Sequence, residues 1–98
     1  MRIFISQPMK GKTDSEIKQE RERIIEKVRE EYGEAVTVIE SFFEGAPADA
    51  KPLWFLGKSL EMLASADLAV FASGWQDARG CRIEHDCAVA YGIGTMEM

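Results

Sequence analysis

The side chains best suited to chemistry lie in the last third of the chain, where a polar loop connects an apolar strand to a helix. Glu84 is expected in the first turn of that helix, and Asp77 lies seven residues earlier, in the loop. Open α/β folds bind ligands at this place, because the carboxyl ends of strands meet the N-termini of helices there. A helix N-terminus also favours an ionised carboxylate. If Glu84 is a nucleophile, the chain is an enzyme that acts on a sugar, and Asp77 could serve as a second carboxylate.

Both carboxylates also have structural explanations. Glutamate is common in a first helical turn because it interacts well with the helix dipole, and aspartates in glycine-rich loops usually serve as turn or cap residues. Asp86 is the other nearby carboxylate, but it lies two residues beyond Glu84 and points off the helix in another direction. Asp77 is therefore the better candidate for the second carboxylate.

Two cationic segments could hold an anion. The loop after the first predicted strand contains Lys10, Lys12 and Thr13 and opens onto a helix N-terminus, where amide groups and cations could converge on a phosphate. This loop is not a P-loop, because no second glycine stands at the required spacing. Arg79 and Arg82 could clamp an anion or a carboxylate. The structural alternatives are a solvated turn for the lysines and pairing with nearby aspartates for the arginines.

Aromatic residues flank the same segments. Trp75 and Phe43 could stack on a base, although either could equally provide hydrophobic cover. His85 follows Glu84 directly and points away from it on a helix, which favours a surface or interface position over acid-base chemistry. Trp75 is therefore the aromatic candidate for a ligand contact.

Apolar and β-branched runs predict a parallel sheet. The runs fall at 2–6, 35–39 and 67–72, and residues 95–98 are long enough for only a stub of a fourth strand. The run at 67–72 lacks clean alternation, which suits a strand covered on both faces. With a helical pattern between successive strands, we predict an α/β fold: a small doubly wound parallel sheet of about four strands with helices on both faces.

Three helical patterns separate these strands. Thr13 and Glu16 form a capping box at the start of the first helix, whose charged residues, Arg21 among them, should coat its outer side, and Gly33 should end it. Pro52 suits the first position of the second helix, whose leucines form an apolar stripe to about residue 65. The third helix is expected at about 82–91, with inward-facing side chains at Ile83, Cys87, Ala88 and Tyr91.

Length, charge and composition restrict the class of protein. The 98 residues are expected to form one domain, 1–98, with a modest core that would gain from a partner subunit. A net charge of -5 and the lack of a basic run argue against binding a nucleic acid polymer. No segment approaches a membrane span, and the apolar start is too short for a signal peptide, so we expect a cytoplasmic protein. Two cysteines six residues apart and one histidine do not suggest a metal site.

Several short segments carry a resemblance to a known superfamily. They are Ser6-Gln7-Pro8-Met9, Ala66-Asp67, and Gly80-Cys81-Arg82-Ile83-Glu84 followed by Ala88-Val89-Ala90-Tyr91-Gly92. On these residues the chain resembles the nucleoside 2-deoxyribosyltransferase superfamily. Nearly end to end it is similar to a small bacterial and phage branch, on the segments Lys51-Pro52-Leu53-Trp54 and 79–85.

The resemblance implies a flavodoxin-like fold, a homodimer or higher homo-oligomer, and neither a metal nor an organic cofactor. It implies that Glu84 attacks the anomeric carbon of a nucleoside or nucleotide and that the base leaves. A covalent deoxyribosyl-enzyme then passes the sugar to another base or to water. In related nucleotide N-glycosidases the loop after the first strand holds a 5′-phosphate, which fits Lys10, Lys12 and Thr13.

Two positions differ from the characterised members of the superfamily. Those proteins carry an aspartate that orients the sugar or base where this chain has Ser59, and often an aromatic group near Ser6 and Gln7. A serine can hydrogen-bond a sugar hydroxyl but cannot deliver a proton at neutral pH. The alternatives are therefore a non-catalytic binder of a nucleotide or ADP-ribose-like ligand and a structural interaction module. The expected substrate contacts are Ser6, Gln7, Lys10, Lys12, Thr13, Ser59, Trp75, Arg79 and Arg82.

Overall fold

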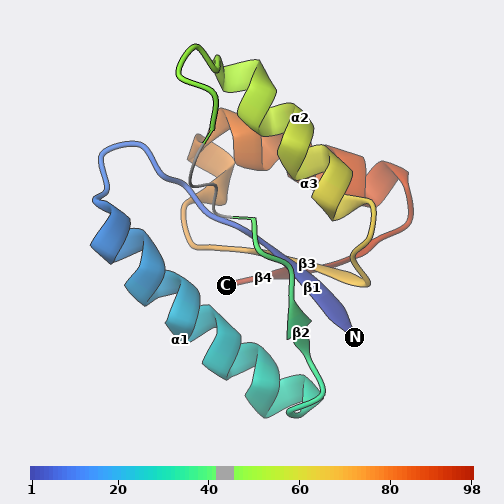
Figure 1. Cartoon of the computed structure of the whole chain (residues 1–98). Coiled ribbons are helices and arrows are strands. Elements are labelled where there is room, and N and C mark those ends of the chain that lie inside the picture. The colour runs from blue at the N-terminus through green and yellow to red at the C-terminus, as the bar shows by residue number, and fades with distance from the viewer. Residues whose placement is uncertain (42–45) are drawn as a thin grey trace.

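A parallel sheet lies between helices on its two faces (Figure 1). The computed structural model describes residues 1–41 and 46–98, and within these ranges it has four strands in the order β2-β1-β3-β4. Each neighbouring pair of these strands is parallel, so the predicted α/β fold, a small flavodoxin-like doubly wound sheet, is confirmed. The elements are β1 (Arg2–Ser6), α1 (Asp14–Tyr32), β2 (Thr37–Val38), α2 (Pro52–Leu63), β3 (Leu68–Phe71), the 3₁₀ turn η1 (Trp75–Asp77), α3 (Arg79–Ala90) and β4 (Gly94–Glu97).

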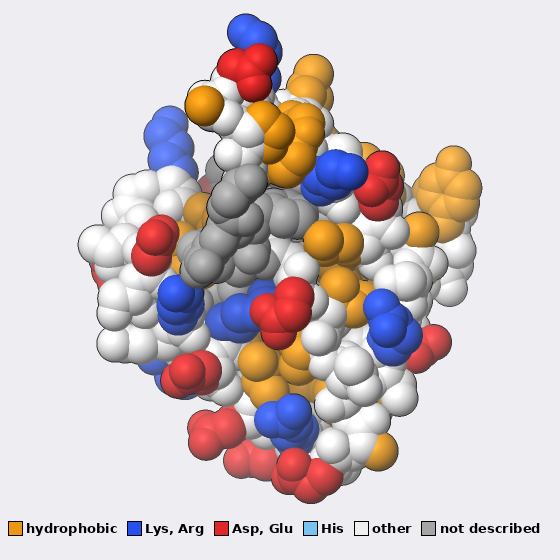
Figure 2. Space-filling model, viewed as in Figure 1, with side chains coloured by type: hydrophobic (Ala, Val, Ile, Leu, Met, Phe, Trp, Pro, Cys, Tyr) orange, Lys and Arg blue, Asp and Glu red, His pale blue; other side chains and the backbone are white. Residues whose placement is uncertain are grey.

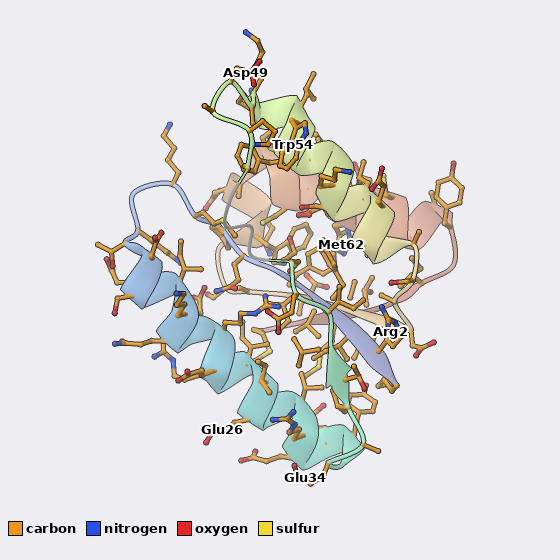
Figure 3. All side chains as sticks on the ribbon, in the orientation of Figure 1. Arg2, Glu26, Glu34, Asp49, Trp54 and Met62 are labelled. Carbon is orange, nitrogen blue, oxygen red and sulfur yellow. The ribbon has the colours of Figure 1, made fainter. Side chains whose placement is uncertain are left out.

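Alternation along β1 builds a separate core on each face of the sheet (Figure 3). Ile3 and Ile5 pack with side chains of α1, whereas Phe4 packs on the opposite side with side chains of α2 and α3. Successive side chains of a strand point to opposite faces of its sheet. Ser6 lies two residues beyond Phe4 and is 2 % exposed, so its hydroxyl belongs to the layer between β1 and the helices α2 and α3.

The strand order creates a crevice at the carboxyl ends of β1 and β3. The chain leads from β1 to β2 on one side and then to β3 on the other side of β1. In open α/β sheets, connections that leave in opposite directions open a crevice where ligands bind. Ser6 is in register with Phe71, so the last residues of β1 and β3 lie next to each other at this crevice.

The first helix begins and ends at the predicted residues. Thr13 Oγ1 accepts a hydrogen bond of 3.1 Å from the Glu16 backbone N–H, and the Thr13 N–H donates one of 3.1 Å to Glu16 Oε1. At the other end, Gly33 has a φ of 88° and donates its N–H to the carbonyl of Arg29 at 2.8 Å. The capping box and the glycine C-cap are therefore both confirmed.

The edge strands and α3 differ from the sequence-based expectations. β2 has two residues rather than five, and β4 pairs with all of β3 rather than forming a stub. α3 begins at Arg79, three residues earlier than predicted. Tyr91 is 83 % exposed, so its predicted inward packing is wrong. The buried residues of α3 are Cys81, Glu84 and Ala88, whose spacing of three and four places them on one side of the helix.

The second helix is apolar but only partly covered. Leu63 is buried in the core, whereas Leu53, expected on the same stripe, is 77 % exposed. Hydrophobic side chains accordingly reach the surface over α2, and acidic and basic side chains are interspersed elsewhere on this face of the molecule (Figure 2). In the described ranges, no helix combines the length and the apolar character needed to cross a membrane.

Candidate functional site

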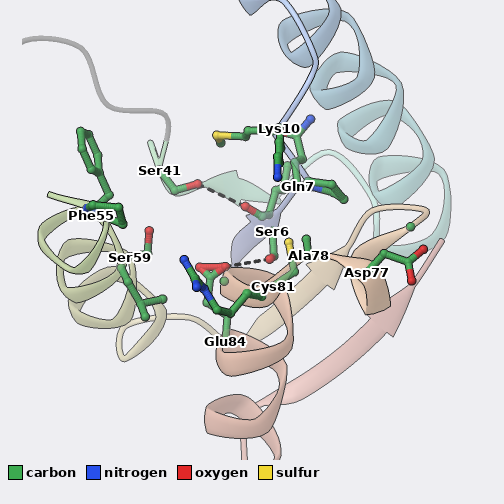
Figure 4. A pocket seen from close by; sticks show the side chains of 18 of the residues that line it. Ser6, Gln7, Lys10, Ser41, Phe55, Ser59, Asp77, Ala78, Cys81 and Glu84 are labelled. Atoms are coloured by element: carbon green, nitrogen blue, oxygen red, sulfur yellow. Dashed lines mark hydrogen bonds between the residues drawn. The ribbon is translucent and has the colours of Figure 1, made fainter.

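A cleft of about 750 Å³ opens at the carboxyl ends of β1 and β3 (Figure 4). This volume falls within the range of about 300–1,000 Å³ that is typical of small-molecule sites. Its walls come from the loop after β1, one face of α2, and the segment from the end of η1 to the second turn of α3. The cleft therefore occupies the crevice that the strand order creates.

Glu84 reaches this cleft from the second turn of α3. Its side chain is 8 % exposed, and the Ser6 hydroxyl donates a hydrogen bond of 2.8 Å to Glu84 Oε1 (Figure 4). The prediction that Glu84 lies in the first turn is wrong, because α3 begins at Arg79. The free amide groups of the helix N-terminus therefore lie one turn before Glu84. The carboxylate is therefore held by Ser6 rather than by the start of the helix.

Burial controls the ionisation of Glu84. It raises the pKa of Glu84 to about 7, and the hydrogen bond from Ser6 opposes part of this shift. A carboxyl group with such a pKa is partly ionised at neutral pH. Its ionised form is poorly solvated, because the group is buried. The thiol of Cys81 lies one helical turn earlier, and burial also raises its pKa. This side of α3 therefore presents a desolvated, titratable carboxyl group to a ligand-sized cleft.

Asp77 lines the same cleft without meeting Glu84. It is exposed on η1, and its carboxylate points away from that of Glu84 (Figure 4). Ser59 also lines the cleft, from α2, and lies on the other side of Glu84 in this view. The structure thus brings both predicted carboxylates to one cleft but does not pair them.

Two of the four predicted cationic contacts line the cleft. Lys10 and Arg79 do so, and both are exposed. In the described part of the chain, neither side chain makes an ion pair. Lys12 instead lies 3.5 Å from Glu20 Oε2, and Arg82 donates a hydrogen bond of 2.9 Å to a backbone carbonyl of η1. An anion in the cleft would therefore meet Lys10 and Arg79 rather than the other two cations.

Gln7 and Thr13 support the loop after β1. Gln7 lines the cleft and is buried, and its Nε2 donates to the carbonyl of Ile17 at 3.0 Å and to Glu20 Oε1 at 3.1 Å. Thr13 caps α1 and is not among the residues that line the cleft. These contacts hold the loop against α1. They therefore fix the backbone from which the Lys10 side chain extends.

Trp75 lies outside the cleft. Its indole stacks on the imidazole of His85, with ring centroids 4.2 Å apart and an interplanar angle of 17°, and its Nε1 donates to Glu97 Oε1 at 3.1 Å. The structure therefore does not bring Trp75 to the other predicted ligand contacts, and His85 is half-buried. Phe43, the other aromatic candidate, lies outside the described residues.

Sequence reasoning missed a buried polar group behind the cleft. Arg21, expected on the outer side of α1, is 8 % exposed and donates to a backbone carbonyl after β2 at 2.7 Å and to Ser41 Oγ at 3.4 Å. Burial lowers the pKa of Arg21. Ser41 in turn donates to a backbone carbonyl of β1 at 3.3 Å and lines the cleft. The available signal was spacing, because Arg21 follows Ile17 by four residues and precedes Ile24 by three.

The cleft combines several kinds of recognition group. Within residues 1–41 and 46–98, no three His, Cys, Asp or Glu side chains are grouped to hold a metal ion. In addition to the Glu84 carboxyl, the polar lining of the cleft includes three serine hydroxyls and the cations Lys10 and Arg79. The apolar lining includes Phe55 and Leu56 of α2. Hydroxyls suit a sugar, cations suit an anionic group and apolar side chains suit a planar ring. The serines are Ser6, Ser41 and Ser59.

One comparison with known proteins gives a match. A family model described as a domain of unknown function, DUF4406, covers residues 1–96. No curated protein and no solved structure matches the chain.

Proposed function

The chain belongs to the DUF4406 family, a domain of unknown function, and from its site we propose that it cleaves or transfers the N-glycosyl bond of a nucleoside or nucleotide. The observation that carries the proposal is the buried Glu84 carboxyl, 8 % exposed, held by Ser6 at 2.8 Å within a ligand-sized cleft. The resemblance of residues 80–84 to the nucleoside 2-deoxyribosyltransferase superfamily suggests the class of reaction.

A desolvated carboxylate suits this reaction because the transition state is cationic. Breaking an N-glycosyl bond, like breaking other glycosidic bonds, develops positive charge on the sugar ring. Glu84 is poorly solvated when ionised, and a cationic ring beside it restores an interaction that the neutral substrate does not provide. The free-energy cost of burying this carboxylate is thus recovered in the transition state.

The proposed reaction has two steps. In the first, Glu84 Oε2 bonds to the anomeric carbon while the bond to the base nitrogen breaks, and the electron pair leaves with the base. Ser6 engages Oε1, which is why Oε2 is the attacking atom. The base takes a proton from water or from Asp77 at the cleft. In the second step, water or another base attacks the same carbon, the bond to Glu84 Oε2 breaks and releases the carboxylate, and the proton of the attacking group passes to solvent.

Incubation with a substrate panel tests this proposal. The panel contains ribo- and 2′-deoxynucleosides and their 5′-monophosphates, each with and without a second free base as acceptor. Chromatography of the products is expected to show free base, or an exchanged base where the acceptor is present. If no member of the panel loses its base at any pH from 5 to 9, the proposed reaction is wrong.

The pH profile of kcat/KM is expected to rise through about pH 7 and then level off. The nucleophile must be ionised, and burial raises the pKa of Glu84 to about 7. At pH 5, two units lower, only about one hundredth of the molecules carry the ionised form. Initial rates at low substrate concentration measure this profile. A rise centred near pH 4.5, the ordinary value for a glutamate, would contradict a desolvated nucleophile.

Reversing the two cleft charges should discriminate nucleotides from nucleosides. Lys10→Glu combined with Arg79→Glu is expected to raise KM for a 5′-monophosphate at least about tenfold, because two attractive charges become repulsive, and to change KM for the nucleoside less than about twofold. Arg23→Glu combined with Lys27→Glu, both on exposed parts of α1, controls for the same change in net charge. Equal effects on both substrates would show that these cations do not contact a phosphate.

A non-catalytic binder is the second candidate function. The observation that favours it is the Asp77 carboxylate, which points away from Glu84 and so provides no paired acid in this arrangement (Figure 4). Such a protein would bind a nucleotide or an ADP-ribose-like ligand in the same cleft. Calorimetric titration with the substrate panel separates the two functions, because saturable binding without release of base supports the binder and release of base supports the enzyme.

A further inference from the structure

Three aromatic rings pack together beside α3, and none of the three residues lines the cleft. The His85 ring stacks on Trp75 at 4.2 Å and meets Phe71 of β3 edge-on at 4.8 Å, and the Phe71 and Trp75 centroids are 5.5 Å apart. Trp75 is fixed further by its hydrogen bond of 3.1 Å to Glu97 of β4. The cluster therefore joins α3, η1, β3 and β4 through the residue that directly follows Glu84.

We propose that His85 and Trp75 are positioning residues for Glu84: their stack fixes the rotation of α3 about its axis and thereby directs the Glu84 carboxyl to Ser6. The bearing of this inference on catalysis rests on the proposed function. Its effect on the environment of Glu84 can be measured without any turnover.

Helix geometry connects the two side chains. Consecutive residues leave a helix axis about 100° apart, so a fixed direction for His85 also fixes the direction of Glu84. The side chains that α3 buries beside Glu84, Cys81 and Ala88, are small and make fewer contacts than a ring would, and Ile83 and Cys87 are only half-buried. The His85 ring, held by Phe71 and Trp75, is a larger contact. A rotation that broke this contact would move Glu84 away from Ser6 and toward water.

The loop before α3 depends on the same cluster. Trp75 is the first residue of η1, and Asp77 and Ala78, which line the cleft, follow it by two and three residues. Arg82 holds η1 from the helix side through its hydrogen bond of 2.9 Å to the Gln76 carbonyl. The stack therefore fixes the position of the Glu84 carboxyl group and also the position of the adjacent wall of the cleft.

Carbon-13 NMR of the glutamate side chains tests the inference by reporting the titration of Glu84 directly, with its signal assigned by its loss in Glu84→Gln. His85→Ala is expected to lower the pKa of Glu84 by at least about one unit, because a carboxyl group that reaches water is less desolvated. His85→Phe keeps a flat ring in the stack and is expected to retain the original titration. Asp86→Ala, at the next and exposed position of α3, is the matched control.

The variants also separate packing from charge. The titratable or charged groups that line the cleft with Glu84 are Lys10, Asp77, Arg79 and Cys81, and all of them are unchanged in these variants. A Glu84 titration that is unaltered in folded His85→Ala would overturn the inference. So would an equal shift in His85→Phe, since the flat ring would then not be what holds Glu84 in place. If His85→Ala does not fold, Trp75→Leu removes the other ring of the stack and is expected to give the same shift.

Turnover adds a second measurement. In a catalytically active chain, His85→Ala is expected to lower kcat at least about tenfold with a smaller change in KM, and His85→Phe to restore most of kcat. Absence of base release in every variant, together with the expected NMR shift, would reject the proposed reaction and retain the positioning role. Full kcat in His85→Ala would reject the positioning role alone.

Discussion

Replacing Glu84 by glutamine is expected to lower the rate of base release at least about 1,000-fold. Glutamine keeps the size of the side chain, and its carbonyl oxygen can still accept the hydrogen bond from Ser6, but it cannot form the covalent glycosyl intermediate. Single-turnover release of base at pH 8 is the appropriate measurement, because Glu84 is then largely ionised in the unmodified chain. Glu22→Gln, on an exposed part of α1, controls for the loss of one carboxylate.

Asp77→Asn shows whether a second carboxylate takes part. The Asp77 carboxylate points away from Glu84, so we expect this variant to retain activity within about tenfold. Loss of a general acid typically costs about 100-fold or more, and a loss of that size would show that Asp77 turns into the cleft during the reaction.

Unchanged release of base in Glu84→Gln would remove Glu84 from the mechanism.

The same Glu84→Gln substitution is expected to stabilise the fold by about 3 kcal/mol at pH 8 and to change its stability little at pH 4. In the folded chain the pKa of Glu84 is about 7, against an ordinary value of 4.5. Below about pH 4.5 the group is protonated in both the folded and the unfolded chain, and no ionisation cost arises. As the pH rises toward 7 the unfolded chain loses its proton first, so the unmodified fold loses stability, and above about pH 7 the full cost applies.

Urea unfolding of both chains at pH 4, 5.5, 7 and 8 measures this difference. Glutamine has no proton to lose, so the gap between the two free energies of unfolding should widen over the interval from about 4.5 to 7. Glu22→Gln should follow the unmodified chain throughout. A gap that does not change with pH would mean that Glu84 is not desolvated, whatever the outcome of the activity measurements.

The fold was predictable because its signals are local. The capping box at Thr13 and Glu16 and the glycine at position 33 mark the ends of α1, and their hydrogen bonds form as expected. The β-branched and apolar runs gave the parallel strands, although β2 is short and β4 long. Pairing partners set the length of an edge strand, and a single run of residues does not reveal them.

The start and rotation of α3 were not predictable in the same way. Ala78 precedes the helix without any side-chain cap, so nothing in the sequence marks its first residue. An acid also interrupts the stripe of Cys81, Glu84 and Ala88, just as Arg21 interrupts the apolar stripe of α1. A search for hydrophobic periodicity misses a buried charge. The burial of Glu84 and Arg21 depends on how α3 and α1 pack against the sheet, which a single helical pattern does not specify.

The contacts that define the site are long-range. Ser6 and Glu84 are separated by 78 positions in the chain, and the hydrogen bond between them depends on the order of the strands and on the rotation of α3. Lys10 and Arg79 line the cleft, whereas Lys12 pairs with Glu20. These differences depend on side-chain conformations that the sequence does not reveal. Sequence reasoning therefore gave the edge of the sheet and the candidate residues, but not which of them meet.

Alternation along β1 also limits how this family can diverge. Gain or loss of one residue inside β1 would turn the Ser6 hydroxyl from α3 toward α1 and would exchange the apolar side chains of both layers at once. Evolution can therefore alter the partner of Glu84 by substitution at position 6, but not by an insertion or deletion within the strand. Ancestral and present-day chains should share the length of β1 even where the residue at its end has changed.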